Sequence, residues 1–280
     1  MLLILALALM RPVEAADDVK PGRPALAFLL SVEVDDLERD AKRQHETVLA
    51  SRQRLATSQR MAQRGLASVD AVEQEAADAR FQQAREAEMS SVRLLKAYQR
   101  DVLNGATPAD PNREFELVLD VLQSQEATAR VEADFRGFKH KQAQTLWRRG
   151  AISRPERDSA DLESANAQAS VALLKTRQAR LALLQARRPK EGRAVPGEVR
   201  RRELALLRAQ VEHETLVATV TLSRFEQARE RGRPSPTPAE LEALHKTSEE
   251  AQAILAGDRK RLAEAEAQAD ADAAPDAVKP

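Results

Sequence analysis

The sequence predicts an all-α protein of three tandem antiparallel helical hairpins, with about six long helices in all. The first observation is composition: aromatic residues make up 3% of the chain, and Ala, Leu, Glu, Gln, Arg and Lys dominate it. This mixture is typical of long helices and coiled coils. The second is proline placement, because a proline inside a helix costs about 3 kcal/mol. The thirteen prolines fall at 12–24, 108–111, 155, 189–196, 234–238 and beyond 274, which leaves long proline-free intervals.

The third observation is a reversal signal around Gly150. Gly150 can take the left-handed conformation that ends a helix. Ser153 and Glu156 have the spacing of a capping box, in which the Ser hydroxyl accepts from the N–H of residue 156 and the Glu carboxylate accepts from the N–H of Ser153. Pro155 falls in the first turn, where its missing N–H costs nothing. One helix is therefore expected to end, and the next to begin, within about four residues.

The same signal recurs along the chain. Gly65 and Ser68 precede Gly150 and Ser153 by 85 residues each, and Thr237, which opens a further capping box with Glu240, follows Ser153 by 84. Evenly spaced stop and start signals indicate an internal repeat of helical hairpins.

The elements are expected in the following order. The apolar run over residues 1–10 suits the core of a secretory signal, so residues 1–16 are interpreted as a signal peptide with a cleavage site at Val13-x-Ala15. An irregular lead over 17–30 follows, because Pro21, Gly22 and Pro24 interrupt it. The expected hairpins cover 31–103, 113–188 and 198–269, and the Asp-, Ala- and Pro-rich tail over 270–280 is expected to be disordered.

The second helix of the second hairpin, expected over about 154–188, carries a heptad seam of mostly small residues. Its members are Leu162, Ala165, Ala169, Ala172, Thr176, Ala179, Leu183 and Ala186. A shift of 85 residues places the seam of the first hairpin at Ala77, Ala84, Ala87, Ser91, Leu94 and Tyr98, with Arg80 and Asp101 as exceptions. Small seam residues bury little area, so each hairpin is expected to pack against its neighbours or against another chain.

Nothing in the sequence points to an enzyme, a cofactor or a metal. The chain has no cysteine, and its four histidines share no motif of metal-ligand spacing. Forty-four basic and forty-four acidic residues balance, and aromatics are scarce, which argues against binding of nucleic acid. A basic cluster over 187–202 is open to two interpretations. It is either a contact site for lipid headgroups, a polyanion or an acidic partner, or helix-end charge paired with Glu191, Glu198 and Glu203.

Residues 61–68 (MAQRGLAS) and 146–153 (LWRRGAIS) resemble the hairpin tips of two families. They are similar to the periplasmic α-hairpin of HlyD-type membrane fusion (adaptor) proteins and to the helix-pair repeats of TolC-type outer-membrane efflux proteins. Adaptors of that family engage the channel through an Arg, a Leu and a Ser at fixed spacing. The Leu position matches Met61 and Leu146, the Ser position matches Ser68 and Ser153, and the Arg position falls on Thr57 and Gln142.

The tips are therefore the candidate partner-binding site. The residues concerned are Met61, Arg64, Gly65, Leu66 and Ser68 in the first hairpin, and Leu146, Trp147, Arg149, Gly150, Ile152 and Ser153 in the second. Trp147, the only tryptophan, is either an exposed anchor or a side chain that closes the last layer of the seam.

The resemblance implies a non-enzymatic adaptor or channel-like component of an efflux or secretion assembly, periplasmic or outer-membrane associated. Its partners would then be proteins of the cell envelope, such as an outer-membrane channel or an inner-membrane transporter. The alternative is a structural coiled-coil scaffold or spacer of the envelope with no transport role. That alternative predicts a homo-oligomer, held by helix faces, that tolerates substitutions at the tips.

Overall fold

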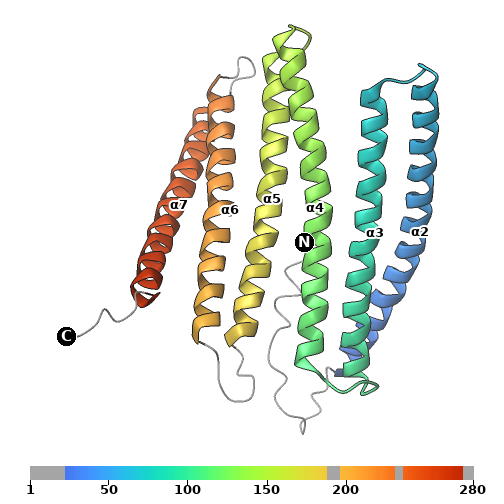
Figure 1. Ribbon diagram of the computed structural model, residues 1–280, viewed down its shortest axis with the longest axis vertical. Helices are drawn as coiled ribbons and strands as arrows, with labels where there is room; N and C mark the ends of the chain where they lie inside the picture. Colours follow the sequence, from blue (N-terminus) through green and yellow to red (C-terminus); the bar gives the residue numbers. More distant parts are fainter. Residues whose placement is uncertain (1–22, 188–195, 231–235, 274–280) are drawn as a thin grey trace.

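The computed structural model describes residues 23–187, 196–230 and 236–273, and in these ranges the protein is all-helical. The prediction of six long helices in antiparallel hairpins is confirmed there (Figure 1). The helices are α2 (Arg23–Gln63), α3 (Val69–Leu103), α4 (Pro111–Arg148), α5 (Arg154–Arg187), α6 (Pro196–Glu230) and α7 (Pro238–Ala273).

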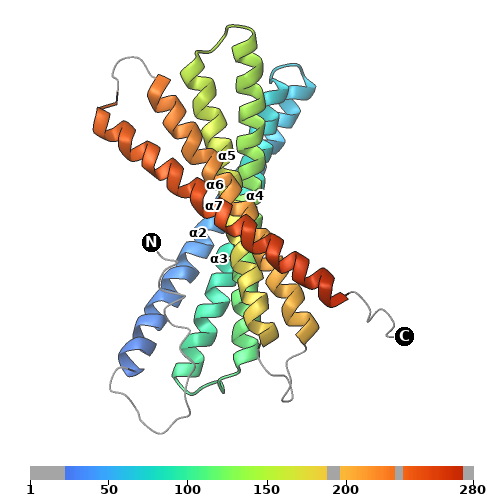
Figure 2. The ribbon, with the colours of Figure 1, turned by 90° about the vertical axis from the view of Figure 1, so that its left-hand side faces the viewer.

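The helices form an open, twisted single layer. Over the described residues, each helix packs only against the helices that precede and follow it in the chain, so α2 and α7 do not meet. Figure 1 shows the row from α2 to α7, and Figure 2 shows that successive helices rotate until the two edge helices cross in projection. The hairpins are therefore not separate rods, because α3 packs on α4 and α5 packs on α6 to make one continuous array.

Burial follows from the place of each helix in the row. On the edge helix α2, buried residues repeat at three- and four-residue steps, as expected for one covered face. They are Ala27, Leu30, Val34, Gln44, Val48 and Ser51, with the half-buried Leu37 and Ala41 between Val34 and Gln44. Inner helices instead bury pairs that are two residues apart, which lie on nearly opposite sides of a helix. These pairs are Ala77 and Ala79 on α3, Phe115 and Leu117 on α4, Leu181 and Leu183 on α5, and Ala218 and Val220 on α6. An inner helix thus has two opposed seams.

The predicted irregular lead is wrong over residues 23–30, because α2 begins at Arg23. Pro24 falls in its first turn, where a proline is tolerated, and Ala27 and Leu30 continue the buried face of the helix. At the other end of the chain α7 continues to Ala273, so residues 270–273 are helical where a disordered tail is predicted. The predicted signal peptide (1–16), the rest of the lead (17–22) and the rest of the tail (274–280) lie outside the described residues.

A membrane-spanning helix would need about 20 consecutive apolar residues. Within the described ranges, no helix contains an apolar stretch that meets this requirement.

Candidate functional site

Two hairpin tips lie at one end of the array. The α2–α3 and α4–α5 turns are both at the top in Figure 1, and the α3–α4 turn is at the bottom. Just below the tips, α3 and α4 are joined by Gln142 Nε2, which donates to Asp70 Oδ2 at 2.7 Å. Lys139 Nζ donates to Gln74 Oε1 at 3.4 Å nearby. The two tips therefore lie at the same end of the array, and these bonds join the first tip to the side of α4.

Each tip ends its first helix in the same way. Gly65 has φ 72° and Gly150 has φ 70°, values in the left-handed region that favours glycine. At the first tip, the N–H groups of Gly65 and Leu66 donate to the carbonyls of Ala62 (2.9 Å) and Met61 (2.8 Å). At the second, Gly150 and Ala151 donate to Trp147 (2.8 Å) and Leu146 (2.9 Å). Both closures are Schellman motifs.

A third closure of the same kind lies at the opposite end of the array. Gly105 has φ 73°, its N–H donates to Val102 O at 3.1 Å, and the N–H of Ala106 donates to Asp101 O at 2.9 Å. Gly105 lies between the predicted hairpins 31–103 and 113–188, and this motif is not among the features predicted from the sequence. The glycine signal therefore marks helix ends in general, and the apolar residues around Gly65 and Gly150 must distinguish the tips.

The helices that leave the tips begin with side-chain caps. Ser68 Oγ accepts from the N–H of Ala71 at 3.2 Å. At the second tip, the carboxylate of Glu156 accepts from both the N–H (2.7 Å) and the hydroxyl (2.8 Å) of Ser153. The prediction that this hydroxyl accepts from the N–H of Glu156 is therefore wrong, because the hydroxyl donates to the carboxylate instead. The complete reciprocal box appears at Thr237, whose N–H donates to Glu240 (2.7 Å) and whose hydroxyl accepts from the N–H of Glu240 (3.3 Å). Residues 231–235 of the third reversal, including Gly232, lie outside the described residues.

Large apolar side chains face solvent at the first tip. Leu66 is 67% exposed, Val69 is 73% exposed and Met61 is 42% exposed. Val69 was missed by sequence reasoning, although a valine directly after the Ser68 cap was a visible signal. Removing apolar side chains from water lowers the free energy, so a cluster of exposed apolar side chains at a turn is typical of a contact surface.

The second tip is more polar and partly self-covered. Trp147 is 42% exposed, and the guanidinium of Arg157 lies 4.3 Å from its ring centroid. Trp147 therefore fits neither predicted alternative fully, the exposed anchor or the side chain that closes the last layer of the seam. Part of its ring is exposed to solvent, and part is stacked against Arg157 of α5. Leu146 is 36% exposed, whereas Ile152 is half-buried.

The remaining tip residues are placed as follows. Arg64 and Arg149 are exposed, so the predicted tip residues surround both glycines. The positions that match the adaptor arginine are engaged elsewhere: Thr57 Oγ1 donates to Gln53 O at 2.9 Å, and Gln142 bonds to Asp70. The apolar and Ser positions of the motif thus lie at each tip. At the Arg position, the side chains of Thr57 and Gln142 already donate hydrogen bonds within the protein.

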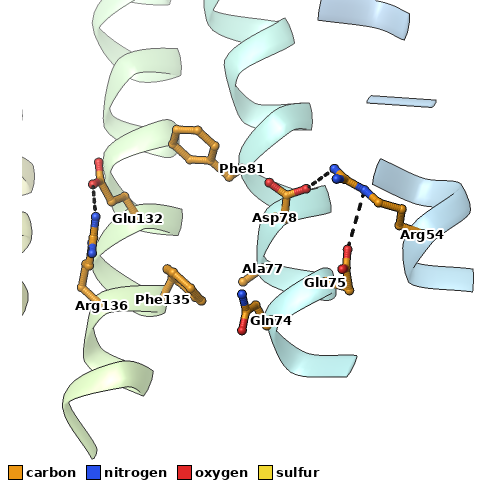
Figure 3. A pocket seen from close by; sticks show the side chains of 9 residues that line it. All are labelled: Arg54, Gln74, Glu75, Ala77, Asp78, Phe81, Glu132, Phe135 and Arg136. Atoms are coloured by element: carbon orange, nitrogen blue, oxygen red, sulfur yellow. Dashed lines mark hydrogen bonds and ion pairs between the residues drawn. The ribbon is translucent and has the colours of Figure 1, made fainter. Parts of the chain in front are cut away.

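Two hollows lie on either side of the α3–α4 junction and share Ala77 and Phe135. Their volumes are about 410 Å³ and about 390 Å³. Figure 3 shows the larger one, in which Phe81 and Phe135 face the gap between the helices. Its charged groups are paired: Arg54 with Asp78 at 2.8 Å and with Glu75 at 3.9 Å, and Arg136 with Glu132 at 3.7 Å. Both hollows are gaps in the packing beside Ala77, whose small side chain leaves space next to Phe135, and in the larger hollow next to Phe81 as well.

The histidines and the basic cluster are engaged in local pairs. His45 contacts Glu86 at 2.7 Å, and His140 contacts Asp161 at 2.6 Å. Over the ranges described, no three His, Asp or Glu side chains converge as metal ligands. In the basic cluster, Arg187 pairs with Glu203 at 2.7 Å, and Arg202 pairs with Glu198 at 3.7 Å, as the helix-end interpretation expects. Residues 188–195 of the cluster lie outside the described part of the chain.

Comparison with protein-family models, with curated proteins and with solved structures gives no match to this chain. Function is therefore inferred from the chain's own geometry.

The cap of α5 predicts a pH-dependent stability. The N–H of Ser153, and secondly its hydroxyl, donate to Glu156 and hold the pKa of that carboxyl below its ordinary value. Because the folded pKa is the lower one, the stabilisation is fully present above the ordinary glutamate pKa of about 4.3 and is lost as the pH falls through the folded pKa. Wild type should exceed Glu156→Gln in thermal midpoint at pH 7, and the difference should vanish on acidification. An NMR titration in which Glu156 has an ordinary or raised pKa would contradict this.

Proposed function

We propose that this protein is a non-enzymatic helical-hairpin protein that docks a protein partner through its tips. The observation that carries the proposal is the exposed apolar cluster of Met61, Leu66 and Val69. The cluster lies beside a helix end held by a positive-φ glycine and a serine cap, so its side chains are presented on a defined backbone. A preorganised apolar tip binds a partner with little ordering cost.

The resemblance to HlyD-type and TolC-type hairpins supports a finer version of this proposal. In that version the protein is an exported adaptor or channel-like component of an efflux or secretion assembly, and the tips meet an envelope channel or transporter. The support is the Gly, apolar and Ser pattern at both tips, which takes the same backbone form at Gly65 and Gly150. The position of the adaptor arginine is not part of that support, because Gln142 is held by Asp70.

The proposal predicts that charge at the first tip abolishes docking. Leu66→Asp combined with Val69→Asp should lower the recovery of a co-purified envelope partner at least about tenfold, because an unpaired carboxylate would be buried in the contact. Since both side chains are exposed, the helicity measured by circular dichroism should not change.

The matched control is Leu184→Asp, an exposed leucine (46%) in the last turns of α5, at the end away from the tips. It should leave recovery unchanged. The tip is not the docking site if the tip variant recovers as much partner as wild type does. The same conclusion follows if the control loses as much partner as the tip variant.

The second candidate function is a structural spacer that self-associates through helix faces. A specific observation favours it, because the edge helix α2 exposes Phe28 at 69% and Leu29 at 58% far from any tip. A spacer without a docking role would keep its cellular distribution when Leu66 and Val69 are changed to aspartate.

A further inference from the structure

The two edges of the helical row differ in chemistry. Each edge helix has one neighbour among the described residues, so a long face of it is open to solvent. The open side of α7 carries mainly charged residues and alanine, with Ile254 (53% exposed) as its only large apolar side chain among those described. A polar outer face of this kind is how a helical array is terminated. The open side of α2 is different.

The α2 free face consists of the exposed residues opposite the seam with α3. Its members are Phe28, Leu29, Val32, Asp35, Asp36, Arg39, Lys42, Arg43, Glu46, Leu49 and Ala50. Four of them are large apolar residues, and they lie in two groups: Phe28 (69% exposed), Leu29 (58%) and Val32 (42%) at one end, and Leu49 (45%) at the other. The members of the face between these groups are acidic (Asp35 and Asp36), then basic (Arg39, Lys42 and Arg43), and acidic again at Glu46.

This order is self-complementary when two copies of α2 run antiparallel about Arg39. Residue i of one copy then lies at the same height along the contact as residue 78 − i of the other. Because a helix turns about 100° per residue, side chains on the same flank of the contact are offset from this rule by one position. Phe28 faces Leu49 and Leu29 faces Ala50 at both ends of the contact, and Val32 faces Glu46 between them. Asp35 faces Lys42 and Asp36 faces Arg43, which gives four opposite-charge pairs across the two-fold axis.

Other arrangements lack this match. A parallel pair in register would set Asp35 against Asp35 and Arg43 against Arg43, and like charges directly opposite are destabilising. The antiparallel pair does bring two Arg39 side chains together on the axis. Each of them, however, already makes an ion pair with Asp36 of its own helix.

We propose that the α2 free face is an interaction surface for a second copy of this chain, which forms an antiparallel, two-fold symmetric dimer centred on Arg39. The contact spans residues 28–50, about 33 Å of helix. In the dimer the row of helices continues across α2, and the apolar groups at both ends of the face are covered.

The dimer has a consequence for docking that rests on the proposed function of the tips. Because α2 runs toward the first tip, antiparallel pairing directs the tips of the two copies to opposite ends. The dimer is then a spacer with a docking surface at each end, so it can hold two identical partners apart.

Cysteine cross-linking tests the geometry, since the natural chain has no cysteine. In the full-length protein, Arg39→Cys should form a disulfide-linked dimer under mild oxidation, because residue 39 meets its own copy on the axis. Leu49→Cys alone should not, because the two copies of residue 49 are separated by 20 positions, or about 30 Å. Phe28→Cys mixed with Leu49→Cys should cross-link to each other, because these two positions share a flank of the contact. Cross-linking of Leu49→Cys alone with none at Arg39→Cys would overturn the antiparallel register.

Sedimentation velocity of variants tests the chemistry. Phe28→Glu with Leu29→Glu should weaken dimerisation at least about 100-fold. Reversal of the acidic pair (Asp35→Lys with Asp36→Lys) should weaken it about tenfold, and the added reversal of the basic pair (Lys42→Asp with Arg43→Asp) should restore it. Arg39→Leu should strengthen the dimer, because it removes the like-charge contact on the axis.

Three results would overturn the proposal. The first is a full-length chain that stays monomeric at every concentration, and the second is failure of the double charge reversal to restore association. The third is dimerisation that occurs only when residues 1–22 have been removed from the chain. The last would assign the face to the N-terminal segment of the same chain. All measurements use the isolated chain, so a failure of tip docking leaves their outcome unaffected.

Discussion

Replacing Leu95 by alanine is expected to lower the free energy of unfolding by about 3 kcal/mol, whereas the same change at Leu94 should lower it by less than about 1 kcal/mol. The two leucines are adjacent on α3, but Leu95 is 7% exposed and Leu94 is 51% exposed. Truncation at Leu95 removes buried methyl groups and leaves a cavity, and truncation at Leu94 removes groups that are half in water. Urea denaturation followed by circular dichroism measures both values.

The adjacent position serves as the control, since both variants make the same chemical change in the same helix. The slope of the unfolding free energy against urea concentration should be equal in the two variants and in wild type. An equal slope shows that the array of helices still unfolds as one unit, so that the free energies can be compared. Equal destabilisation by the two substitutions, or a larger effect at Leu94, would contradict the orientation of α3 described above.

This pair of leucines also shows how far the sequence predicts the packing. The seam of the first hairpin, transferred by 85 residues from the second, includes Leu94, yet the structure exposes Leu94 and buries Leu95 and Ala79 instead. The transfer assumes one seam per helix, as in an isolated hairpin. An inner helix of a single layer has a neighbour on two opposite sides, so its buried residues include pairs two positions apart. No single heptad pattern can describe such a helix.

The helix ends are more predictable than the packing because they depend on local chemistry. Gly65, Gly150, Ser68 and the Thr237 box act within a few residues of backbone, and all of them appear as expected. The site surface depends on which helix lies opposite, and this was not visible in the sequence. The bond from Gln142 to Asp70 crosses between hairpins, for example, and it removes Gln142 from the tip motif.

A buried polar layer between α4 and α5 predicts a second large effect. Glu126 is 8% exposed, its Oε1 accepts from Arg130 Nε at 2.8 Å, and its Oε2 accepts from Gln178 Nε2 at 2.7 Å. The same Gln178 amide donates to Leu122 O at 3.1 Å. Gln178→Leu should therefore lower the free energy of unfolding by about 2 kcal/mol, because it leaves one carboxylate oxygen buried without a donor. Chemical denaturation at neutral pH measures the loss.

Glu126→Leu combined with Gln178→Leu should recover most of that loss, since a layer without a buried charge has no unsatisfied group. The polar layer also opposes sliding of α5 along α4, because only one register pairs Glu126 with Gln178. The double variant should then combine near-wild-type stability with faster hydrogen exchange at amides of α5 next to the layer. If the double variant is less stable than Gln178→Leu alone, the layer stabilises the fold through its hydrogen bonds, and its role in register would have to be abandoned.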